Sequence, residues 1–480
     1  MSIRVLAVAS EAFPLIKTGG LADVVGALPA ALAAHGVAVT TLLPGYPAVM
    51  AALADRADIA VLPDLYGGPA HIRAGRAGPL DLFVLDAPHL FDRPGNPYVG
   101  PAGTDWPDNP LRFAALAQAA EALARGMGSV APFDLVHCHD WQAGLVPAYL
   151  AASGERHQKT VMTVHNLAFQ GQFPAELFPR LGLPDDAFSV DGVEYYGMVG
   201  YLKGGLRHAD AITTVSPTYA AEIMTPACGM GLEGLIAGRA DVVSGIVNGI
   251  DPAVWSPAAD PDLPATFDAR TLSARKQNRL ALETRFGLDH DKAPLFCVVS
   301  RLTWQKGLDL LEQALPTLIR LGAKLALLGS GDRSLETAFR DAATRHHGRV
   351  GVIIGYDEAL SHLMVGGADA ILVPSRFEPC GLTQLYGLAY GCVPVVSRVG
   401  GLADTVIDAN DAALEAGVAT GVQFTPVDVP SLEMALRRTV ALHADTALWR
   451  RIQKRGMAGD LGWDRRAKAY ADLFRSLLKS

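Results

Sequence analysis

The feature of this sequence that most limits its fold is an alternation of short apolar runs with segments long enough to form helices. Within each run the hydrophobic residues are nearly continuous, as expected for parallel strands that helices cover on both faces. The runs are Arg4–Ser10, Val37–Leu43, Leu80–Leu85, Leu135–Cys138, Thr160–Val164, Ala211–Val215 and Val242–Val247, then Leu295–Val299, Lys324–Leu328, Val350–Ile354, Ala370–Val373 and Val393–Val396. We therefore predict an α/β fold of two doubly wound, Rossmann-like domains.

The boundary between the two domains is predicted near residue 250. Just after Asn248 the strand pattern gives way to a segment rich in Pro, Ala and Asp that continues to Pro264. The predicted parts are an N-terminal domain, a C-terminal domain and a final helix, over residues 1–250, 251–460 and 461–480. Ligands of open α/β sheets bind beyond the carboxyl ends of the strands, so two such sheets facing each other would enclose a deep cleft.

Composition and cysteine content argue against several classes of protein. The chain carries 41 Lys and Arg against 49 Asp and Glu, and a net charge of −8 is unsuited to a nucleic acid or an anionic membrane surface. Five widely spaced cysteines without a Cys-x-x-Cys pair indicate neither a disulfide framework nor a zinc knuckle. Val5–Ala9 is too short for a secretion signal, and His35-Gly36 interrupts the apolar stretch Ala27–Leu43. We expect a cytoplasmic protein without a transmembrane segment, and its oligomeric state stays open, a homo-oligomer included.

Two loops that follow strands carry residues suited to binding phosphate. Lys17, Gly19 and Gly20 stand between the first strand and an apolar helix pattern. A lysine beside two glycines at a helix start can hold an anion against backbone N–H groups, although such glycines also occur merely to make a turn. In the second half, Arg301 and Lys306 follow a strand and can converge on a diphosphate. Two such loops in two domains predict a ligand held between them.

The densest polar segment follows the strand that ends at Val373. Glu378 lies there in a proline-stiffened loop, where its carboxylate can accept hydrogen bonds from two sugar hydroxyls. The N–H groups at the start of the next helix can receive a phosphate. These N–H groups belong to Gly381, Leu382 and Thr383. A purely structural alternative makes Glu378 a partner of the helix dipole and Cys380 a small core residue.

Polar residues also follow two strands of the first half. Asp140 ends the run that contains His137 and His139, and these two histidines share one face of their strand because they are two residues apart. Without a third clear ligand we do not predict a metal site, and we interpret Asp140 as a carboxylate that serves a reacting group. His165 follows the next strand, where it can donate to a substrate hydroxyl, transfer a proton or simply orient its loop.

Six segments together resemble the bacterial glycogen synthases and the related plant starch synthases. They are KTGGLADVVGALP from Lys17, HCHDWQAGL from His137, TVHNLAFQG from Thr163, NGID from Asn248, SRLTWQKG from Ser300 and PSRFEPCGLTQLYGLAYG from Pro374. The resemblance implies a GT-B glycosyltransferase whose C-terminal helix crosses back onto the N-terminal domain. It also implies transfer of glucose from ADP-glucose to the non-reducing end of an α-1,4-glucan such as glycogen, with retention of anomeric configuration and without a cofactor.

The resemblance further assigns roles at the donor. Lys17 and the Gly19-Gly20 turn would lie near the diphosphate, and Arg301 and Lys306 would neutralise its charge from the other domain. The NGID turn would bring Asn248 within reach of the donor. The further residues expected to bind the donor substrate are Ser375, Cys380, Gly381, Leu382 and Thr383.

Five more roles follow from the same resemblance. Glu378 would hold hydroxyls of the transferred glucose, with His165 close to that sugar and Asp140 close to the reacting centre. Tyr98 would line the sugar or acceptor side, and Tyr356 would stack on the adenine.

The chemistry of glucosyl transfer agrees with these roles. Breaking a glucosyl–phosphate bond builds negative charge on the departing diphosphate, which fixed cations stabilise without a metal ion. We favour a mechanism in which that phosphate accepts the proton of the incoming hydroxyl from the same face, over a double displacement through Asp140. A sugar-nucleotide epimerase and a catalytically idle glucan-binding protein remain as alternatives. A nicotinamide dehydrogenase is disfavoured because no Gly-x-Gly-x-x-Gly follows the first strand.

Overall fold

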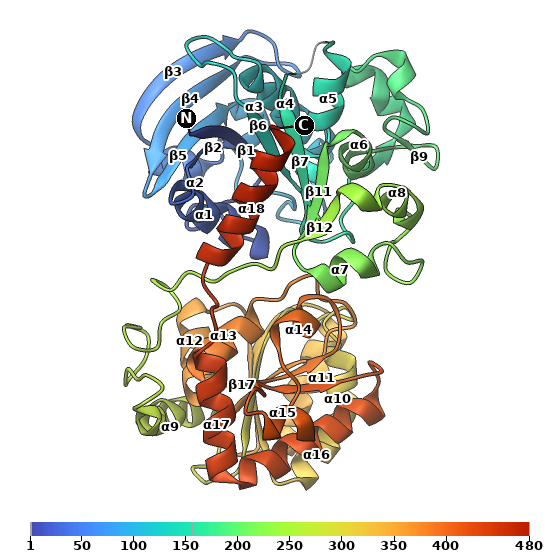
Figure 1. Cartoon of the computed structure of the whole chain (residues 1–480). Coiled ribbons are helices and arrows are strands. Elements are labelled where there is room, and N and C mark those ends of the chain that lie inside the picture. The colour runs from blue at the N-terminus through green and yellow to red at the C-terminus, as the bar shows by residue number, and fades with distance from the viewer. Residues whose placement is uncertain (1, 155–156, 480) are drawn as a thin grey trace. The chain divides into compact units, whose positions relative to one another are not determined.

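The computed structural model describes residues 2–154 and 157–479, and the chain divides into two compact units (Figure 1). The N-terminal unit comprises Met1–Gly249 together with Trp463–Ser480, and the C-terminal unit comprises Ile250–Gly462. Each unit is built around its own sheet and its own hydrophobic core. No helix of the described residues combines the length and the apolar character that crossing a bilayer would require.

The N-terminal unit is built on a nine-stranded sheet in the order β12-β11-β7-β6-β1-β2-β5-β4-β3. Its strands are β1 (Ile3–Val8), β2 (Val37–Pro44), β3 (Ala54–Leu62), β4 (Ala70–Ala77), β5 (Leu80–Asp86), β6 (Leu135–His139), β7 (Lys159–Val164), β11 (Ala211–Thr214) and β12 (Val243–Gly245). All neighbours pair in parallel except β3 with β4 and β4 with β5, which are antiparallel. The predicted parallel strands are confirmed.

One edge of this sheet is antiparallel, which the sequence analysis did not predict. The hairpin of β3 and β4 has no counterpart among the predicted strands, because β3 is largely exposed and its sequence, ADRADIAVL, begins with charged residues. An edge strand of this kind lacks the continuous apolar run that marks a buried strand. A second, three-stranded antiparallel sheet was also not predicted. Its strands are β8 (Gln172–Pro174), β9 (Glu194–Tyr195) and β10 (Met198–Gly200).

Helices cover both faces of the large sheet. They are α1 (Gly20–Ala33), α2 (Pro47–Ala52), α3 (Pro88–Phe91), α4 (Asn109–Ala124), α5 (Val146–Ala152), α6 (Tyr201–His208), α7 (Pro217–Glu222), α8 (Glu233–Ala237) and the C-terminal α18 (Asp464–Leu477). Figure 1 shows α18 lying against the N-terminal unit beside α1. Its fully buried Tyr470 and Phe474 share one hydrophobic cluster with Val5 of β1 and Leu28 of α1. The last helix of the chain therefore completes the core of the first domain.

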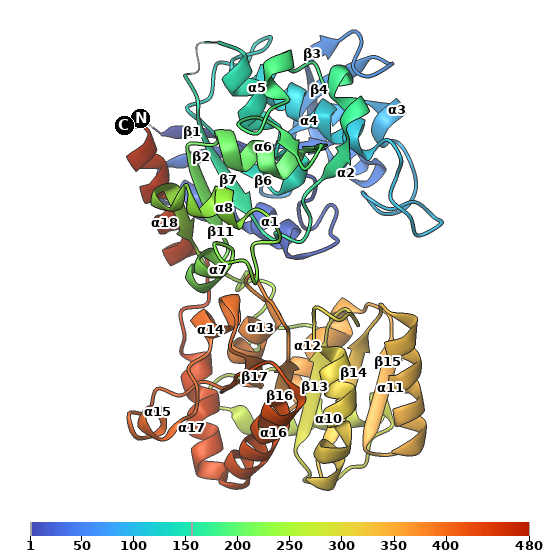
Figure 2. The same ribbon diagram turned by 90° about the vertical axis from the view of Figure 1, so that its right-hand side faces the viewer.

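The C-terminal unit has a six-stranded, wholly parallel sheet in the order β15-β14-β13-β16-β17-β18, most of which is seen side by side in Figure 2. Its strands are β13 (Leu295–Val299), β14 (Lys324–Gly329), β15 (Val350–Ile354), β16 (Ala370–Val373), β17 (Val393–Ser397) and β18 (Val422–Phe424). Its helices are α9 (Arg275–Phe286), α10 (Leu308–Arg320), α11 (Arg333–Arg345), α12 (Glu358–Gly367), α13 (Thr383–Tyr390), α14 (Gly400–Thr405), α15 (Asp411–Glu415), α16 (Val429–Ala444) and α17 (Thr446–Met457).

The strand orders locate one topological switch point in each sheet. In the N-terminal unit the chain runs outward from β1 through β2 on one side and from β6 through β7 on the other. In the C-terminal unit it runs outward from β13 through β14 and from β16 through β17. The loops that leave two such neighbouring strands turn in opposite directions, which leaves a crevice at their carboxyl ends. These four loops are where a ligand site is expected.

We expect Phe474→Ala in α18 to lower the free energy of unfolding of the N-terminal unit by about 3–5 kcal/mol, because it opens a cavity in the core. Leu478→Ala removes a 39% exposed side chain from the residue that directly follows the same helix, and it should cost less than about 1 kcal/mol. Urea unfolding followed by circular dichroism measures both. Equal losses for the two variants would mean that α18 is not part of this core.

Candidate active site

The first loop at the switch point of the N-terminal unit carries Lys17. Its Nζ lies 2.9 Å from Oδ1 of Asp23 in α1 and 5.3 Å from the centre of the Phe13 ring. Gly19 stands at the N-cap of α1 in an extended conformation, and a Cβ there would meet no atom within 4 Å. Neither crowding nor backbone conformation therefore requires a glycine at this position. Gly20 is the exposed first residue of the helix.

Glu11, which the sequence analysis did not single out, organises this loop. The Glu11 carboxylate is buried and accepts hydrogen bonds from the Thr18 N–H, from the Thr18 hydroxyl at 2.6 Å and from the Tyr98 hydroxyl. Tyr98 also lies 2.7 Å from the Ser10 hydroxyl, and its burial, followed by the neighbouring Glu11, raises its pKa well above the ordinary value. Glu11 thus joins the Lys17 loop to Tyr98. Its one sequence signal is an acidic residue at the end of a buried apolar strand.

Asp140 lies in the loop after β6, on the other side of the same switch point. Its backbone adopts a φ of 56°, in the left-handed region that is uncommon for residues other than glycine. Its Oδ1 accepts the His165 N–H at 2.7 Å, which ties the loop after β6 to the loop after β7. Burial raises the Asp140 pKa to about 7, although the N–H groups of His165 and Asn166 oppose this rise. The carboxyl group is therefore divided between its two protonation states near neutral pH.

Three histidines form a buried row behind Asp140. His137 and His139 share a face of β6 as predicted, with ring centres 4.1 Å apart. His139 Nδ1 lies 3.0 Å from His165 Nε2, and His137 Nε2 lies 2.7 Å from the Thr163 hydroxyl. Burial lowers the pKa of His165 to about 3, so its imidazole is neutral at physiological pH. These nitrogen atoms are therefore already engaged in hydrogen bonds with each other or with Thr163.

In the C-terminal unit, Lys306 and Glu378 meet from the two loops at the switch point. Lys306 Nζ lies 2.8 and 2.6 Å from the two Glu378 oxygens, and the Ser375 hydroxyl donates to Oε2 at 2.8 Å. Glu378 is buried, so these partners offset much of the cost of removing its charge from water. Beside this pair, Arg376 makes a bidentate ion pair with Asp309, with distances of 2.6 and 2.7 Å.

Glycines hold the Glu378 loop against its neighbours. Gly307 has a φ of 66°, and a Cβ there would lie 2.0 Å from the Pro374 carbonyl oxygen. A Cβ at Gly400 would lie 2.1 Å from the Glu378 carbonyl oxygen, which also accepts the Gly401 N–H at 3.1 Å. The sequence Gly-Gly-Leu-Ala-Asp occurs both here and in the Lys17 loop, over residues 19–23 and 400–404. The glycine at 400 is required by packing, whereas the one at 19 is not.

The helix start that follows Glu378 is open to an anion. The N-cap Leu382 supplies no side-chain cap to α13. The N–H groups of Gly381, Leu382 and Thr383 make no hydrogen bond with any other residue that the structure describes. Cys380 is buried just before them.

Three predicted residues remain, of which Arg301 shares the loop after β13 with Lys306 and the other two lie on other loops. Arg301, after β13, is exposed, and its guanidinium makes no hydrogen bond or ion pair within residues 2–154 and 157–479. Tyr356, after β15, is 75% exposed and donates its hydroxyl to Glu358. Asn248 is buried, and its Oδ1 has no partner among the described residues. An unpaired buried polar atom of this kind is consistent with a ligand contact.

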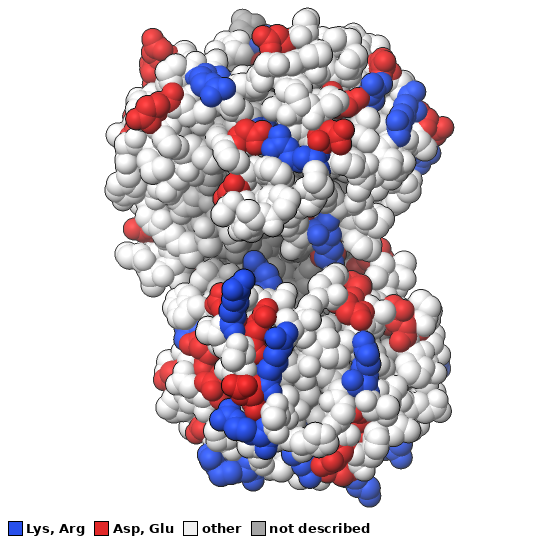
Figure 3. All heavy atoms as spheres, turned by 180° about the vertical axis from the view of Figure 1, so that it is seen from behind, with Lys and Arg blue, Asp and Glu red and all other residues white. Residues whose placement is uncertain are grey.

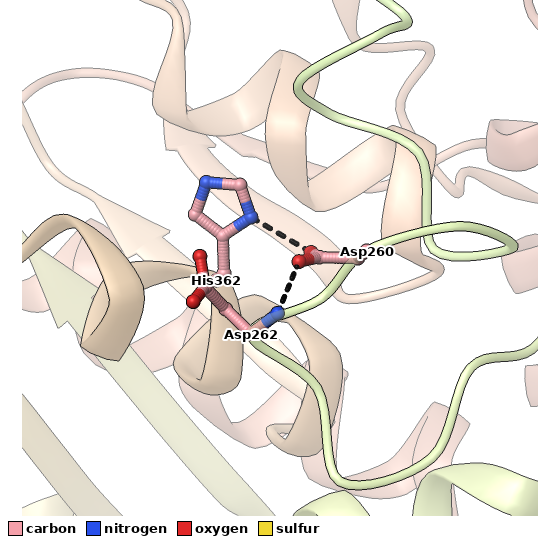
Figure 4. Close-up of side chains that lie close together, drawn as sticks. All are labelled: Asp260, Asp262 and His362. Atoms are coloured by element: carbon pink, nitrogen blue, oxygen red, sulfur yellow. Dashed lines mark hydrogen bonds and ion pairs between the residues drawn. The ribbon is translucent and has the colours of Figure 1, made fainter.

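Another cluster of the C-terminal unit contains side chains that could bind a metal ion, but both carboxylate oxygens of its central residue, Asp260, already accept hydrogen bonds. Asp260, Asp262 and His362 offer ligand atoms within 4.8 Å of one another (Figure 4). Oδ2 of the buried Asp260 accepts from His362 Nδ1 at 2.7 Å and from the Tyr390 hydroxyl, and its Oδ1 accepts the Asp262 N–H. Trp255 stacks on His362 with ring centres 3.8 Å apart. The cluster anchors the segment after residue 250 to α12 and α13.

The two halves of the chain match two family models. The starch synthase catalytic domain matches residues 4–238, and the glycosyl transferases of group 1 match residues 282–443. Glycogen synthase of Rhodopseudomonas palustris strain HaA2 is 60% identical to the chain over 99% of each protein. Glycogen synthase of Novosphingobium aromaticivorans is 59% identical over 100% of this chain and 99% of that protein.

The chain belongs to the glycogen synthase family. The predicted resemblance is confirmed, and the protein is a glycosyltransferase. Among solved structures, the catalytic domain of starch synthase IV from Arabidopsis thaliana, bound to ADP and acarbose, superposes with a TM-score of 0.91 at 31% identity over the whole of both chains. The predicted GT-B fold is confirmed by this likeness and by the two mainly parallel sheets of this glycogen synthase family member.

Asp140 gives a pH-dependent test of the site. Its folded-state pKa of about 7 exceeds the unfolded value of about 3.9, so the folded protein binds the extra proton and loses stability as the pH rises between these values. Asp140→Asn keeps an acceptor for the His165 N–H without the charge. We expect the stability of this variant relative to wild type to rise by about 1 kcal/mol per pH unit from pH 5 to 7.

Asp268→Asn is the matched control in urea unfolding. The hydrogen bond from the Arg270 N–H, helped by Thr271, lowers the pKa of Asp268 to about 2, so this group titrates below the tested range. Its stability difference from wild type should stay flat from pH 5 to 7. A flat line for Asp140→Asn as well would contradict the raised pKa.

Proposed function

We propose that the protein transfers glucose from ADP-glucose to the non-reducing end of an α-1,4-glucan, with retention of the anomeric configuration. The observation that carries this proposal is the Lys306–Glu378 pair beside the unpaired N–H groups at the start of α13. A carboxylate suits sugar hydroxyls, and a cation with a helix N-terminus suits a diphosphate. The full-length relatives named glycogen synthase, and the starch synthase IV solved with ADP and acarbose, support the same substrates.

The C-terminal unit supplies the proposed donor site. The exposed guanidinium of Arg301 and the ammonium of Lys306 would neutralise the diphosphate, whose oxygens would also accept from the open N–H groups of α13. Glu378, already oriented by Ser375, would accept hydrogen bonds from hydroxyls of the glucose. Tyr356 offers an exposed ring for the adenine. Cys380 would bound the site with its small buried side chain.

The N-terminal unit supplies the proposed acceptor site. Asp140 and His165 are joined through the His165 N–H, and Tyr98 donates its hydroxyl to Glu11 in the loop after β1. A neutral His165 can donate to or accept from a sugar hydroxyl. Lys17, whose loop has an open glycine at residue 19, would supply a further cation for the departing ADP, and Asn248 would contribute an amide to the donor.

The proposed reaction needs no nucleophile from the protein. The bond from the glucose C1 to the phosphate oxygen breaks, the acceptor O4 attacks C1 from the same face, and the proton of O4 passes to the departing phosphate. ADP then leaves carrying the bonding electron pair. Fixed cations stabilise the charge that grows on this leaving group. We also propose a cytoplasmic location, which suits the five cysteines, none of which forms a disulfide within the described residues.

Release of nucleotide from ADP-glucose and UDP-glucose, with and without glycogen, tests the proposal. We expect glycogen-dependent ADP release that exceeds UDP release by at least about tenfold, because the larger adenine ring would stack better than uracil on the exposed Tyr356. Nuclear magnetic resonance of the new linkage reports its α configuration. Nucleotide release that does not depend on glycogen with either donor would instead favour the alternative of a sugar-nucleotide epimerase.

Glu378→Gln tests the sugar-binding carboxylate. We expect turnover to fall by at least about 100-fold, because an interaction with the transition state is weakened, while the melting temperature falls by only a few degrees. Asp309→Asn is the matched control, since it breaks the neighbouring ion pair with Arg376 and leaves Glu378 in place. A similar fall in turnover for both variants would mean that Glu378 acts only by holding its loop.

A further inference from the structure

We propose that Gln384 is a positioning residue, which aims the open N–H groups at the start of α13 toward the diphosphate of the donor. This inference rests on the proposed function, because it takes a nucleoside diphosphate as the anion. It assigns Gln384 no contact with the substrate. The side chain instead acts through the two peptide units that follow Cys380 and Gly381, because it holds both of their carbonyl groups.

The Gln384 amide is fully buried, and three oxygen atoms fix its orientation. Its Nε2 donates to the Cys380 carbonyl at 3.0 Å and to the Gly381 carbonyl at 2.9 Å, and it lies 3.1 Å from the Thr405 hydroxyl of α14. That hydroxyl donates its own proton to the Gly401 carbonyl at 2.6 Å, so it faces Nε2 as an acceptor. An amide turned the other way would place Oε1 against these oxygens without a proton to share.

The planarity of the peptide bond turns these contacts into a direction for the N–H groups. The carbonyl oxygen and the N–H of one trans peptide unit point to opposite sides. The Cys380 carbonyl shares its unit with the Gly381 N–H, and the Gly381 carbonyl shares its unit with the Leu382 N–H. Because Gln384 holds both carbonyls, both N–H groups point away from its amide. Neither of them bonds with another residue that the structure describes.

The backbone at Gly381 and Leu382 has the form of an anion-binding nest. Gly381 has a φ of 74°, in the left-handed region, and Leu382 has a φ of −114° and a ψ of −30°, in the right-handed region. Successive N–H groups in such a pair form a concavity that binds an anion. A Cβ at Gly381 would lie 2.4 Å from Gln384 Oε1. Position 381 therefore requires glycine both for its φ and for the Gln384 side chain packed against it.

Stability alone does not explain a glutamine at this position. Gln384 Oε1 is buried and has no hydrogen-bond partner among the residues that the structure describes. A buried polar atom without a partner costs free energy, and an apolar side chain of similar size would avoid that cost. The two N–H donors of the same amide therefore have to supply the advantage, and they supply it to the carbonyls behind the nest.

The direction of these N–H groups matters because the chain as a whole does not attract an anion. Its net charge is −8, and Figure 3 shows acidic and basic side chains interspersed on the face that it presents. The Lys306 ammonium already pairs with Glu378, at 2.8 and 2.6 Å from its two oxygens. Fixed N–H groups also need no reorganisation while negative charge grows on the departing diphosphate. The nest is therefore expected to contribute to binding of the diphosphate.

Gln384→Met tests this role, because methionine has a similar size but no N–H donor. The measurement is binding of ADP and of adenosine to the full-length protein by isothermal titration calorimetry. We expect the affinity for ADP to fall about tenfold, because two N–H groups lose their direction toward a charged ligand. The affinity for adenosine, which has no diphosphate, should change less than about twofold. Gln384→Asn keeps an amide in a shorter side chain and should give an intermediate loss for ADP.

Gln453→Met is the matched control. Gln453 is also buried, and its Nε2 donates to the Gly391 carbonyl at 2.7 Å, at the opposite end of α13. This variant loses the same kind of hydrogen bond to the same helix, far from the nest, and it should keep both affinities.

Two results would overturn the role of Gln384. One is an unchanged affinity for ADP in Gln384→Met, and the other is an equal fall for ADP and adenosine, because the side chain would then only stabilise the fold. If Gln384→Met does not fold, Gln384→Asn decides between the same outcomes. Failure of the wild type itself to bind ADP would overturn the proposed donor together with this inference, so the two failures can be told apart.

Discussion

Parallel strands of one sheet all end at the same edge, and this constraint positions the polar groups described above. Lys17 and Asp140 follow β1 and β6, which are neighbours in the sheet although more than a hundred residues separate them. Lys306 and Glu378 likewise follow β13 and β16. Residues far apart in the chain therefore meet, because the topology sends the chain outward from each switch point in both directions. The chemistry depends on this arrangement before it depends on any single side chain.

Bringing charged groups to a buried edge requires partners for them. Glu378 is satisfied by Lys306 and Ser375, and Glu11 is satisfied by Thr18 and Tyr98. Removing both partners would leave a buried carboxylate unpaired, which costs more than the pairing itself contributes. Such pairing also fixes side-chain orientation before a substrate arrives, so less binding energy is needed to order the site. Asp140 differs, because burial outweighs its hydrogen bonds and its pKa rises to about 7.

The elements that the sequence analysis missed have physical reasons in common. The exposed strand β3 and the strands β8 and β9 of the small sheet lack a continuous apolar run because little of their surface is buried, and β4 lacks one because buried residues are interspersed with partly exposed ones. Glu11 was missed because its role comes from contacts with Thr18 and Tyr98, and the contact with Tyr98 spans 87 residues. The parallel strands were predicted well because burial on both faces requires nearly continuous apolar residues, which are visible in the sequence.

The sequence by itself determined the parallel strands of the two sheets, the helices that cover them and the loops that carry the polar residues, because hydrophobic periodicity and glycine placement are local properties. Its motifs also determined the family. Only the tertiary structure decided which residues touch: that Glu378 pairs with Lys306, that Asp140 accepts from His165, and that Tyr470 and Phe474 of the last helix share a core cluster with Val5. The sequence Gly-Gly-Leu-Ala-Asp occurs twice, but a Cβ on its first glycine would meet no atom within 4 Å at residue 19 and would clash with the Glu378 carbonyl at residue 400. The contacts, burial and pKa of a residue depend on its neighbours in space, and many of these are far away in the sequence.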